Sequence, residues 1–324
     1  MPSSRVRVLN LLPELEKYDI TGDVVRYPKG LSEKLRLFKL CKGYDTVFLQ
    51  KKLPSPVESY LLKRCSRRLV FDFDDAIYLR HDKNETLESA SRQIKFKYAV
   101  KNADMVIAGN RILADAARKF NPCVKIIPSA VETRGIPQKD YNSRNDKVVI
   151  GWVGGEINLI HLKLLSETFQ RLSRELKIEI RILCNKGMEI PGVDVRFIPW
   201  SLETQDMEIS RFDIGVMPLP KTRHSEGKCG YKALQYMAAS VPPVVSDVGV
   251  NGEIVENGKE GLVVSEINGF YGALKSLAAA HEFRKELGLN ARKRTERCYS
   301  IPVVAKKLAG ILSCGTQSSS EAAR

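Results

Sequence analysis

The feature that most constrains the fold is a regular alternation of short apolar runs with longer amphipathic stretches of helical length. This alternation is typical of βα units, which build a parallel sheet with helices on its faces. It occurs twice, and the two series are separated by residues 132–146, a polar stretch with Gly135, Pro137, Asn142 and Asn145. That composition is typical of a linker. A chain of 324 residues also exceeds what one hydrophobic core usually organises, so two domains are expected.

The alternation predicts five strands before the linker and six after it. The first five are Gly22–Arg26, Thr46–Gln50, Leu69–Asp72, Met105–Ala108 and Lys125–Pro128. The next six are Val148–Val153, Glu179–Cys184, Asp194–Ile198, Ile214–Met217, Pro243–Ser246 and Gly261–Val264. The expected helices are Val6–Lys17, Pro56–Arg68, Leu87–Lys101, Leu113–Phe120, Ile160–Leu176, Gly230–Ala239 and three stretches beyond Asn268. Two doubly wound halves place the ligand cleft between them, at the carboxyl ends of the strands.

The domain boundaries follow from this pattern. We expect an N-terminal Rossmann-like domain at residues 1–140, a C-terminal one at 147–312 and a disordered, Ser-rich tail at 313–324. The first domain opens without its usual first strand, because Pro2-Ser3-Ser4 already has the composition of the turn that follows such a strand. Either the coding sequence begins further upstream or another segment occupies the centre of that sheet.

The net charge of +14 is concentrated in the first half of the chain. Residues 1–145 contain 28 Lys and Arg against 17 Asp and Glu. A solvated face, an anionic membrane surface and nucleic acid are three possible reasons for this excess. No nucleic-acid motif is present and aromatic residues are not interleaved with the basic clusters, so nucleic acid is ranked last and is not expected as a partner.

Seven widely spaced cysteines without a C-x-x-C pair indicate neither a disulfide framework nor a structural zinc site. No signal peptide opens the chain, and no apolar run reaches the ~18 residues needed to span a bilayer. We therefore expect a cytoplasmic protein with free thiols.

Residues 225–248, S-E-G-K-C-G-Y-K-A-L-Q-Y-M-A-A-S-V-P-P-V-V-S-D-V, contain the densest chemical signal. A glycine-containing turn leads into an amphipathic helix, whose first N–H groups and dipole favour an anion. Lys228 and Lys232 add positive charge, which suits a diphosphate. An ordinary βα turn with surface lysines is the alternative.

This segment resembles the donor-binding motif of retaining GT-B glycosyltransferases of family four, the group 1 type. That motif has a Glu, a glycine turn and a second Glu eight positions later. Here Gly230 matches the turn, Gln235 stands at the second Glu, and Glu226 lies one residue before the position of the first. The similarity continues, in order, through Ser246-Asp247-Val248-Gly249, Glu253-Ile254-Val255, Asn257-Gly258, Gly261–Val264, and earlier through Ile150–Gly154, Asp72–Tyr78, Val106–Asn110 and Ile126–Val131.

The resemblance implies an α/β protein of the GT-B fold with two facing Rossmann-like domains and parallel sheets, in which the donor lies mainly on the C-terminal domain. It implies a donor site formed by Gly154, Gly155, Lys186, Gly230, Tyr231, Lys232 and Gln235. Gln235 would bond the donor ribose and Glu226 the transferred sugar, while Lys228 and Lys232 neutralise the leaving diphosphate. Lys186 and Arg223 are the candidates for the family's basic positions, since Lys163 lies too far along the helix, and Trp200 is a candidate to flank the base.

Asp72, Asp74 and Asp75 follow an apolar run and should lie at a strand's carboxyl end. Asp74 and Asp75 are candidates to orient acceptor hydroxyls or accept a proton. Helix capping and pairing with Lys or Arg is the alternative, and the D-x-D pattern also admits Mg²⁺. Lys51-Lys52-Leu53-Pro54 lines the acceptor site or is solvated. His161 and His224 lack a nucleophile pattern, and we expect no metal site.

The sequence thus predicts a metal-independent glycosyltransferase of hexosyltransferase type that requires neither a cofactor nor a metal. Its donor is a nucleotide-sugar and its acceptor a glycan or lipid-linked molecule, as in polysaccharide biosynthesis. The basic N-terminal half would contact an anionic membrane from the cytoplasmic side. A catalytically weak or silent nucleotide-sugar-binding protein, an N-terminally truncated homologue, is the alternative.

Overall fold

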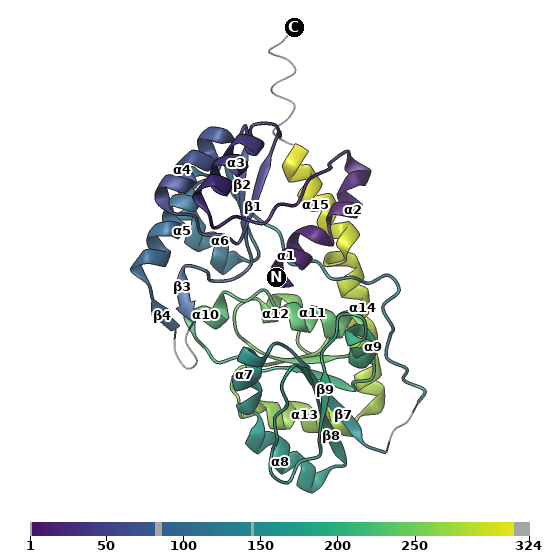
Figure 1. Ribbon diagram of the computed structural model, residues 1–324. Coiled ribbons are helices and arrows are strands. Elements are labelled where there is room, and N and C mark those ends of the chain that lie inside the picture. The colour runs from purple at the N-terminus through teal and green to yellow at the C-terminus, as the bar shows by residue number, and fades with distance from the viewer. Residues whose placement is uncertain (1, 82–85, 144–145, 314–324) are drawn as a thin grey trace. The chain divides into compact units, whose positions relative to one another are not determined.

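The computed structural model describes residues 2–81, 86–143 and 146–313. These residues form two compact α/β units, each built on a parallel sheet (Figure 1). The first unit comprises Met1–Ala130, Gly227–Cys229 and Ile301–Arg324, and the second comprises Val131–Glu226 and Gly230–Ser300. The predicted α/β class with two parallel sheets is confirmed.

The first unit has a four-stranded parallel sheet in the order β1-β2-β5-β6. Its strands are β1 (Val47–Gln50), β2 (Leu69–Phe73), β5 (Met105–Ala108) and β6 (Val124–Ile126). A separate antiparallel pair consists of β3 (Leu79–His81) and β4 (Thr86–Glu88). Its helices are α1 (Pro2–Ser4), the π-helix η1 (Arg5–Leu9), α2 (Leu12–Leu15), the 3-10 helix η2 (Glu16–Tyr18), α3 (Leu31–Cys41), α4 (Pro56–Cys65), α5 (Ala90–Asn102), α6 (Arg111–Arg118) and α15 (Ile301–Ser313).

Strand β2 is buried along its whole length because helices cover both faces of the sheet. Its side chains alternate between the faces, as successive residues of a strand must. Phe71 and Phe73 pack in the core formed with α3, α4, α5 and α6, and Val70 packs in the core formed with α2 and α15. A strand with two apolar faces reads as a continuous apolar run, which is why the sequence identified it.

Asp72 interrupts this apolar run and is fully buried, and its charge is neutralised by Arg7 of η1. Arg7 donates to both carboxylate oxygens of Asp72 and, from Nη1, to the carbonyl of Ile127 at 2.7 Å. Burial alone would lower the pKa of Arg7, but the carboxylate outweighs it, and the pKa is raised. The guanidinium therefore stays charged and ties the N-terminal helical segment to β2 and to the chain after β6.

The second unit has a six-stranded parallel sheet in the order β12-β11-β10-β7-β8-β9. Its strands are β7 (Val148–Val153), β8 (Ile178–Cys184), β9 (Val195–Pro199), β10 (Ile214–Met217), β11 (Pro243–Ser246) and β12 (Leu262–Val264). Its helices are the 3-10 helix η3 (Glu156–Asn158), α7 (Leu159–Lys163), α8 (Ser166–Glu175), α9 (Gln205–Ser210), α10 (Arg223–Glu226), α11 (Tyr231–Ala238), α12 (Asn251–Ile254), α13 (Gly269–Ala279) and α14 (His281–Cys298).

Two glycines on neighbouring strands of this sheet make room for aromatic rings. Gly151 of β7 and Gly215 of β10 are paired in register. A Cβ at Gly151 would lie 2.0 Å from the ring of Phe212, and one at Gly215 would lie 2.4 Å from the ring of Tyr236. Tyr236 of α11 can therefore lie flat on the sheet, where its hydroxyl donates to the carbonyl of Val216 at 3.2 Å. This contact fixes α11, the helix that follows the predicted diphosphate turn.

Helix α15 packs on the sheet of the first unit, next to α2 (Figure 1). Val304 and Leu308 join Leu11 and Val70 in one core. Arg68 strengthens this attachment by donating to the carbonyls of Ile311 and Leu312. The expected C-terminal domain at 147–312 included this helix, whereas the compact units place it with the N-terminal residues. The tail expected at 313–324 lies almost entirely outside the described residues.

Several expected elements differ in the structure. Gly22–Arg26 forms no strand, because its exposed valines have no neighbouring strand to pair with. The helix expected at Val6–Lys17 is broken into η1, α2 and η2, since Pro13 has no N–H to continue the hydrogen-bond ladder of the first segment. The helix expected at Ile160–Leu176 is divided into α7 and α8. Within the described residues no further strand joins the first sheet, whose outer strands are β1 and β6.

The elements that the sequence analysis missed are short or have exposed apolar residues. They are α1, α3, η3, α9, α10, α12 and the β3–β4 pair. Helix α3 had one local signal, since Glu33 accepts a hydrogen bond from the N–H of Gly30, three residues earlier, at the start of the helix.

We expect replacement of Asp72 by Ala to destabilise the first unit by about 3–5 kcal/mol, because it leaves the buried guanidinium of Arg7 without a counter-charge. Hydrogen exchange of the β2 amides under native conditions measures this loss. Asp45→Ala is the matched control, since the ion pair of Asp45 with Arg67 at 2.9 Å is highly exposed, and it should change the exchange far less. Equal effects of the two variants would contradict this account of the buried pair.

Candidate functional site

The glycine turn after β7 leaves room for a lysine side chain of α11. A Cβ at Gly154 would lie 2.8 Å from Cε of Lys232 and 2.7 Å from the ring of Trp152. The ammonium of Lys232 lies 5.6 Å from the centre of that ring, where π electrons attract a cation. Glycine at position 154 is therefore what permits Lys232 to approach the turn. Gly155, which follows, is exposed and precedes η3.

Gly230 gives α11 its N-terminus. It has a left-handed φ of 64°, and a Cβ there would lie 2.2 Å from Cδ1 of Ile254, so a larger residue does not fit. The first N–H groups of a helix have no carbonyl partner within it and lie at the positive end of its dipole. Tyr231 and Lys232 are the first two residues of α11, and both are half-buried. This helix end combines amide hydrogens with an ammonium group, which is an arrangement that can bind a phosphate.

Gln235, expected to bond a ribose, is buried and already has a protein partner. Its Nε2 donates to Oε1 of Gln205 at 3.3 Å, and the same oxygen accepts from the indole Nε1 of Trp200 at 3.1 Å. The structure thus brings together Gln235 and Trp200 through Gln205 of α9, a residue that the sequence analysis did not identify. Its only signal was its place shortly after the strand that ends at Pro199.

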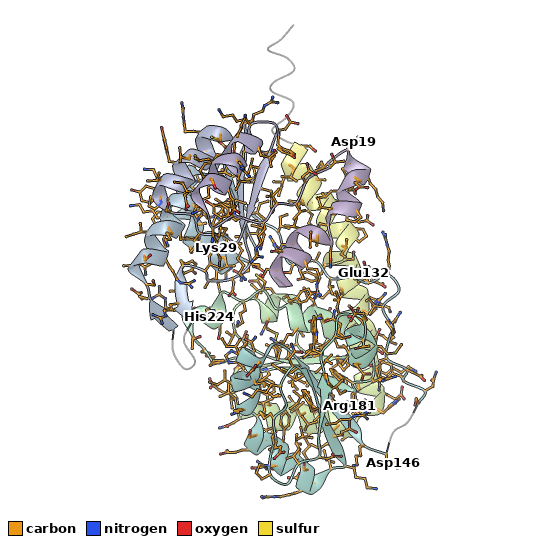
Figure 2. The ribbon with its side chains drawn as sticks, viewed as in Figure 1. Asp19, Lys29, Glu132, Asp146, Arg181 and His224 are labelled. Carbon is orange, nitrogen blue, oxygen red and sulfur yellow. The ribbon has the colours of Figure 1, made fainter. Side chains whose placement is uncertain are left out.

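Two other predicted residues are less closely joined to this group. The ammonium of Lys186 forms an ion pair with Glu156 at 2.9 Å, and the Lys186 side chain is 64% exposed. Glu226 ends the short helix α10 and is exposed, and its carboxylate makes no ion pair with any residue that the structure describes. His224, labelled in Figure 2, is buried on α10. His161 is buried on α7.

In the first unit, Asp74 and Asp75 follow β2 and share one lysine. Nζ of Lys51 lies 3.1 Å from Oδ1 of Asp74 and 3.4 Å from Oδ2 of Asp75. Lys51 also donates to the hydroxyl of Ser3 at 2.9 Å and adopts a left-handed φ of 54° directly after β1. Burial lowers the pKa of Lys51, but the two carboxylates outweigh it, so the pKa is raised and the ammonium stays charged.

Asp72 differs from these two carboxylates, because it is buried in the core in an ion pair with Arg7. The acidic run therefore divides at the end of β2, at Phe73, into one buried residue that supports the fold and two partly exposed carboxylates. Pairing with lysine, the alternative for the acidic run, is observed for Asp74 and Asp75 through Lys51. Among the described residues, no three His, Cys, Asp or Glu side chains are grouped as metal ligands would be.

The segment Gly227–Cys229 belongs to the first unit, although the residues on either side of it belong to the second. Cys229 is buried, and its thiol donates to the carbonyl of Asp74 at 3.2 Å. Burial, reinforced by the carboxylate of Asp74, raises the pKa of the Cys229 thiol well above its ordinary value. Lys228 is half-buried, and its ammonium pairs with no carboxylate of the described chain.

The two parallel-sheet units define a chain of the GT-B fold. Residues 147–280 match the family model described as "Glycosyl transferases group 1". This match covers much of the second unit, including the Gly154 turn, Gly230 and α11. Among curated proteins, no sequence matches the chain.

Solved structures resemble the chain at low sequence identity, and they establish the fold alone. Sucrose-phosphate synthase from Thermosynechococcus elongatus is 14% identical with a TM-score of 0.67, over 90% of this chain and 80% of that one. HepE from Anabaena, solved with UDP and glucose, is 14% identical with a TM-score of 0.68, over 92% and 88%. A glycosyltransferase from Rickettsia africae is 12% identical with a TM-score of 0.67, over 93% and 86%.

The raised pKa of Cys229 predicts that its thiol resists alkylation in the folded protein. Iodoacetamide should modify the partly exposed Cys65, Cys123 and Cys298 first. Raising the pH to about 9 should not make Cys229 react, because the reagent attacks the thiolate and the pKa of this thiol lies higher. Peptide mass spectrometry of samples quenched over time measures this order. Labelling of Cys229 in urea provides the control, and labelling at the rate of Cys298 without urea would contradict the burial described here.

Proposed function

We propose that this protein is a glycosyltransferase that moves a sugar from a nucleotide-sugar donor to a glycan or lipid-linked acceptor. One observation carries the proposal. The segment that matches the group 1 glycosyltransferase model, residues 147–280, is the segment in which the Gly154 turn meets Lys232 at the N-terminus of α11. A structural neighbour of the same fold was solved with UDP-glucose. Retention of the anomeric configuration, a hexosyl donor and independence of metal ions are part of this proposal.

The donor diphosphate would bind at the N-terminus of α11, near Gly154 and Gly155. Gly230 and Tyr231 supply main-chain N–H groups, and Lys232 supplies charge. The nucleoside would extend toward Gln235, whose amide would exchange its bond to Gln205 for one to a ribose hydroxyl. Lys186, exposed on the surface in its pair with Glu156, would contact the donor only after that pair opens.

The chemical step would depend on stabilising the leaving group. As the bond from the anomeric carbon to the diphosphate oxygen breaks, negative charge grows on the diphosphate and is neutralised by Lys228, Lys232 and the helix N–H groups. Glu226 would contact the transferred sugar. Asp74 and Asp75 would accept hydrogen bonds from the acceptor and orient the hydroxyl whose oxygen forms the new bond to the anomeric carbon, and one of the two carboxylates would take the proton that this hydroxyl loses. Lys51, which pairs with both carboxylates, would hold them in place beside the acceptor.

A silent nucleotide-sugar-binding protein is the second candidate, and the bond of Gln235 to Gln205 favours it. An amide already engaged in a buried bond gives up that bond on binding ribose, and it lacks the charge that strengthens such contacts. The two candidates share the donor site and differ in turnover. Gln235→Glu, which restores the carboxylate of the resembling motif, distinguishes them if it turns a binding protein into an active one.

We expect UDP or a UDP-sugar to stabilise the purified protein against heat. A ligand at about 100 times its dissociation constant adds about 2.7 kcal/mol, which differential scanning fluorimetry detects as a clear upward shift. Lys228→Ala should remove most of this shift, because it removes a charge that faces the diphosphate. Lys221→Ala is the control, since Lys221 lies in the same stretch but pairs with Glu266 at 3.1 Å. Panels with GDP and ADP identify the base, and no shift with any nucleotide would reject the proposal.

Peripheral contact with an anionic membrane, from the cytoplasmic side, is a further part of the proposal, and the helices of the first unit support it. Helix α4 adjoins both α3 and α5 in this unit (Figure 1). Together they carry nine Lys and Arg against two Glu. The same three helices also expose large apolar side chains, namely Leu31, Leu35, Leu40, Val57, Tyr60, Ile94 and Tyr98. Apolar side chains among basic ones suit the headgroup region of an anionic bilayer. No helix in the described part of the chain has the length and apolar character to span a membrane.

We expect Leu31→Ser with Leu35→Ser to weaken binding to phosphatidylglycerol vesicles at least about tenfold, because both leucines are largely exposed on successive turns of α3. Flotation at low and high salt measures the binding, which salt should weaken. The matched control is Ile157→Ser with Leu202→Ser, which removes two exposed apolar side chains from the second unit. If the wild-type protein floats equally well with phosphatidylcholine alone, or not at all, the membrane part of the proposal is wrong.

A further inference from the structure

Asn110 uses its whole side-chain amide in one buried position of the first unit. It directly follows Gly109 at the end of β5 and is only 2% exposed. Its Oδ1 accepts from the N–H of Leu113 at 2.8 Å and thereby caps α6. Its Nδ2 donates to the carbonyl of Gly227 at 3.2 Å and to the carbonyl of Lys228 at 3.1 Å. Capping needs only the oxygen, so the two bonds of the nitrogen call for a separate explanation.

The surroundings of Asn110 are shaped to receive the segment Gly227–Cys229. A Cβ at Gly109 would lie 2.4 Å from Sγ of Cys229, and a Cβ at Gly227 would lie 2.7 Å from Cβ of Ala76. Both glycines therefore permit main-chain approaches that a side chain would prevent. The thiol of Cys229 adds a bond to the carbonyl of Asp74. All these contacts lie within the first unit.

The two carbonyls held by Asn110 flank a single α-carbon, that of Lys228. The carbonyl of Gly227 belongs to the peptide plane before Lys228, and the carbonyl of Lys228 belongs to the plane after it. Peptide planes are rigid, so fixing both leaves the φ and ψ of Lys228 little freedom. The direction in which the Lys228 side chain leaves the backbone is then set by Asn110.

We propose that Asn110 is a positioning residue that orients Lys228 toward the diphosphate of the donor. This inference rests on the proposed function, in which Lys228 neutralises the leaving group. Lys228 has a flexible side chain and no carboxylate partner among the described residues, so its contribution depends on where its backbone holds it. A displacement of about 1 Å in a positioned charge can cost about 100-fold in rate.

The decisive variant is Asn110→Asp, which keeps an oxygen to cap α6 but cannot donate to the two carbonyls. Asn121 offers a matched control in the same unit. Its Nδ2 donates to the carbonyls of Val100 and Ala103 at 2.8 and 2.7 Å, and its Oδ1 accepts from the N–H of Cys123 at 2.8 Å. Asn121→Asp therefore loses the same set of bonds away from Lys228. Asn110→Ser, which retains a capping oxygen without a charge, replaces the first variant if it does not fold.

We expect Asn110→Asp to lower kcat at least about tenfold, with the KM for acceptor nearly unchanged, while Asn121→Asp leaves kcat within about twofold. Both should lose similar stability in urea. In a Lys228→Ala background, Asn110→Asp should add little further loss of kcat, because the two residues act through the same group. Equal effects of the two Asn variants on kcat, or full additivity with Lys228→Ala, would overturn the inference.

A readout independent of transfer separates this inference from the proposed function. Hydrogen exchange of the amides of residues 227–230 should accelerate in Asn110→Asp and remain unchanged in Asn121→Asp. If the wild-type protein binds no nucleotide but the two variants still differ in amide exchange, the proposed function is wrong, whereas the role of Asn110 in fixing the segment Gly227–Cys229 is supported. Unchanged exchange in Asn110→Asp would reject this role.

Discussion

The structure depends on a constraint that both sheets share: parallel strands covered by helices on both faces leave polar chemistry only at their ends. In β2, apolar residues fill the strand and the carboxylates Asp74 and Asp75 follow it at once. In the second unit the same rule places Gly154 directly after β7. Asp72 is the exception, because it lies inside the strand, one residue before its end. Its buried carboxylate is paired with the guanidinium of Arg7, which supplies the counter-charge. Burial and charge thus divide one short acidic run into a structural part and a chemical part.

Much of the fold could be predicted because buried strands are continuous apolar runs with polar ends. β5, β7, β10 and β11 have both ends where the sequence placed them. Prediction failed where apolar residues are exposed rather than buried. The valines of Gly22–Arg26 are exposed and unpaired in a sheet, and α3 exposes Leu31 and Leu35, so its pattern did not resemble a helix with one apolar face.

The candidate site could be predicted less completely, because its residues meet through long-range contacts. Local motifs identified Gly154, Gly230 and Lys232, and the structure brings these three together. The partners came from other segments. Gln205 binds Gln235, and Asn110 holds Lys228 from a position more than a hundred residues earlier. Lys51 and Asn110 did have one common signal, since each is a polar residue placed at the carboxyl end of a predicted strand.

The position of α15 has a consequence for synthesis. The first unit contains residues 1–130, yet Val304 and Leu308 of α15 cover one face of its sheet at Val70. During synthesis, the apolar face of the sheet in residues 1–130 therefore stays uncovered until Val304 and Leu308 have emerged from the ribosome. The second unit, whose residues all precede Ile301, can complete its core earlier. The usual order of N-terminal before C-terminal folding is therefore expected to be reversed for the two units of this chain.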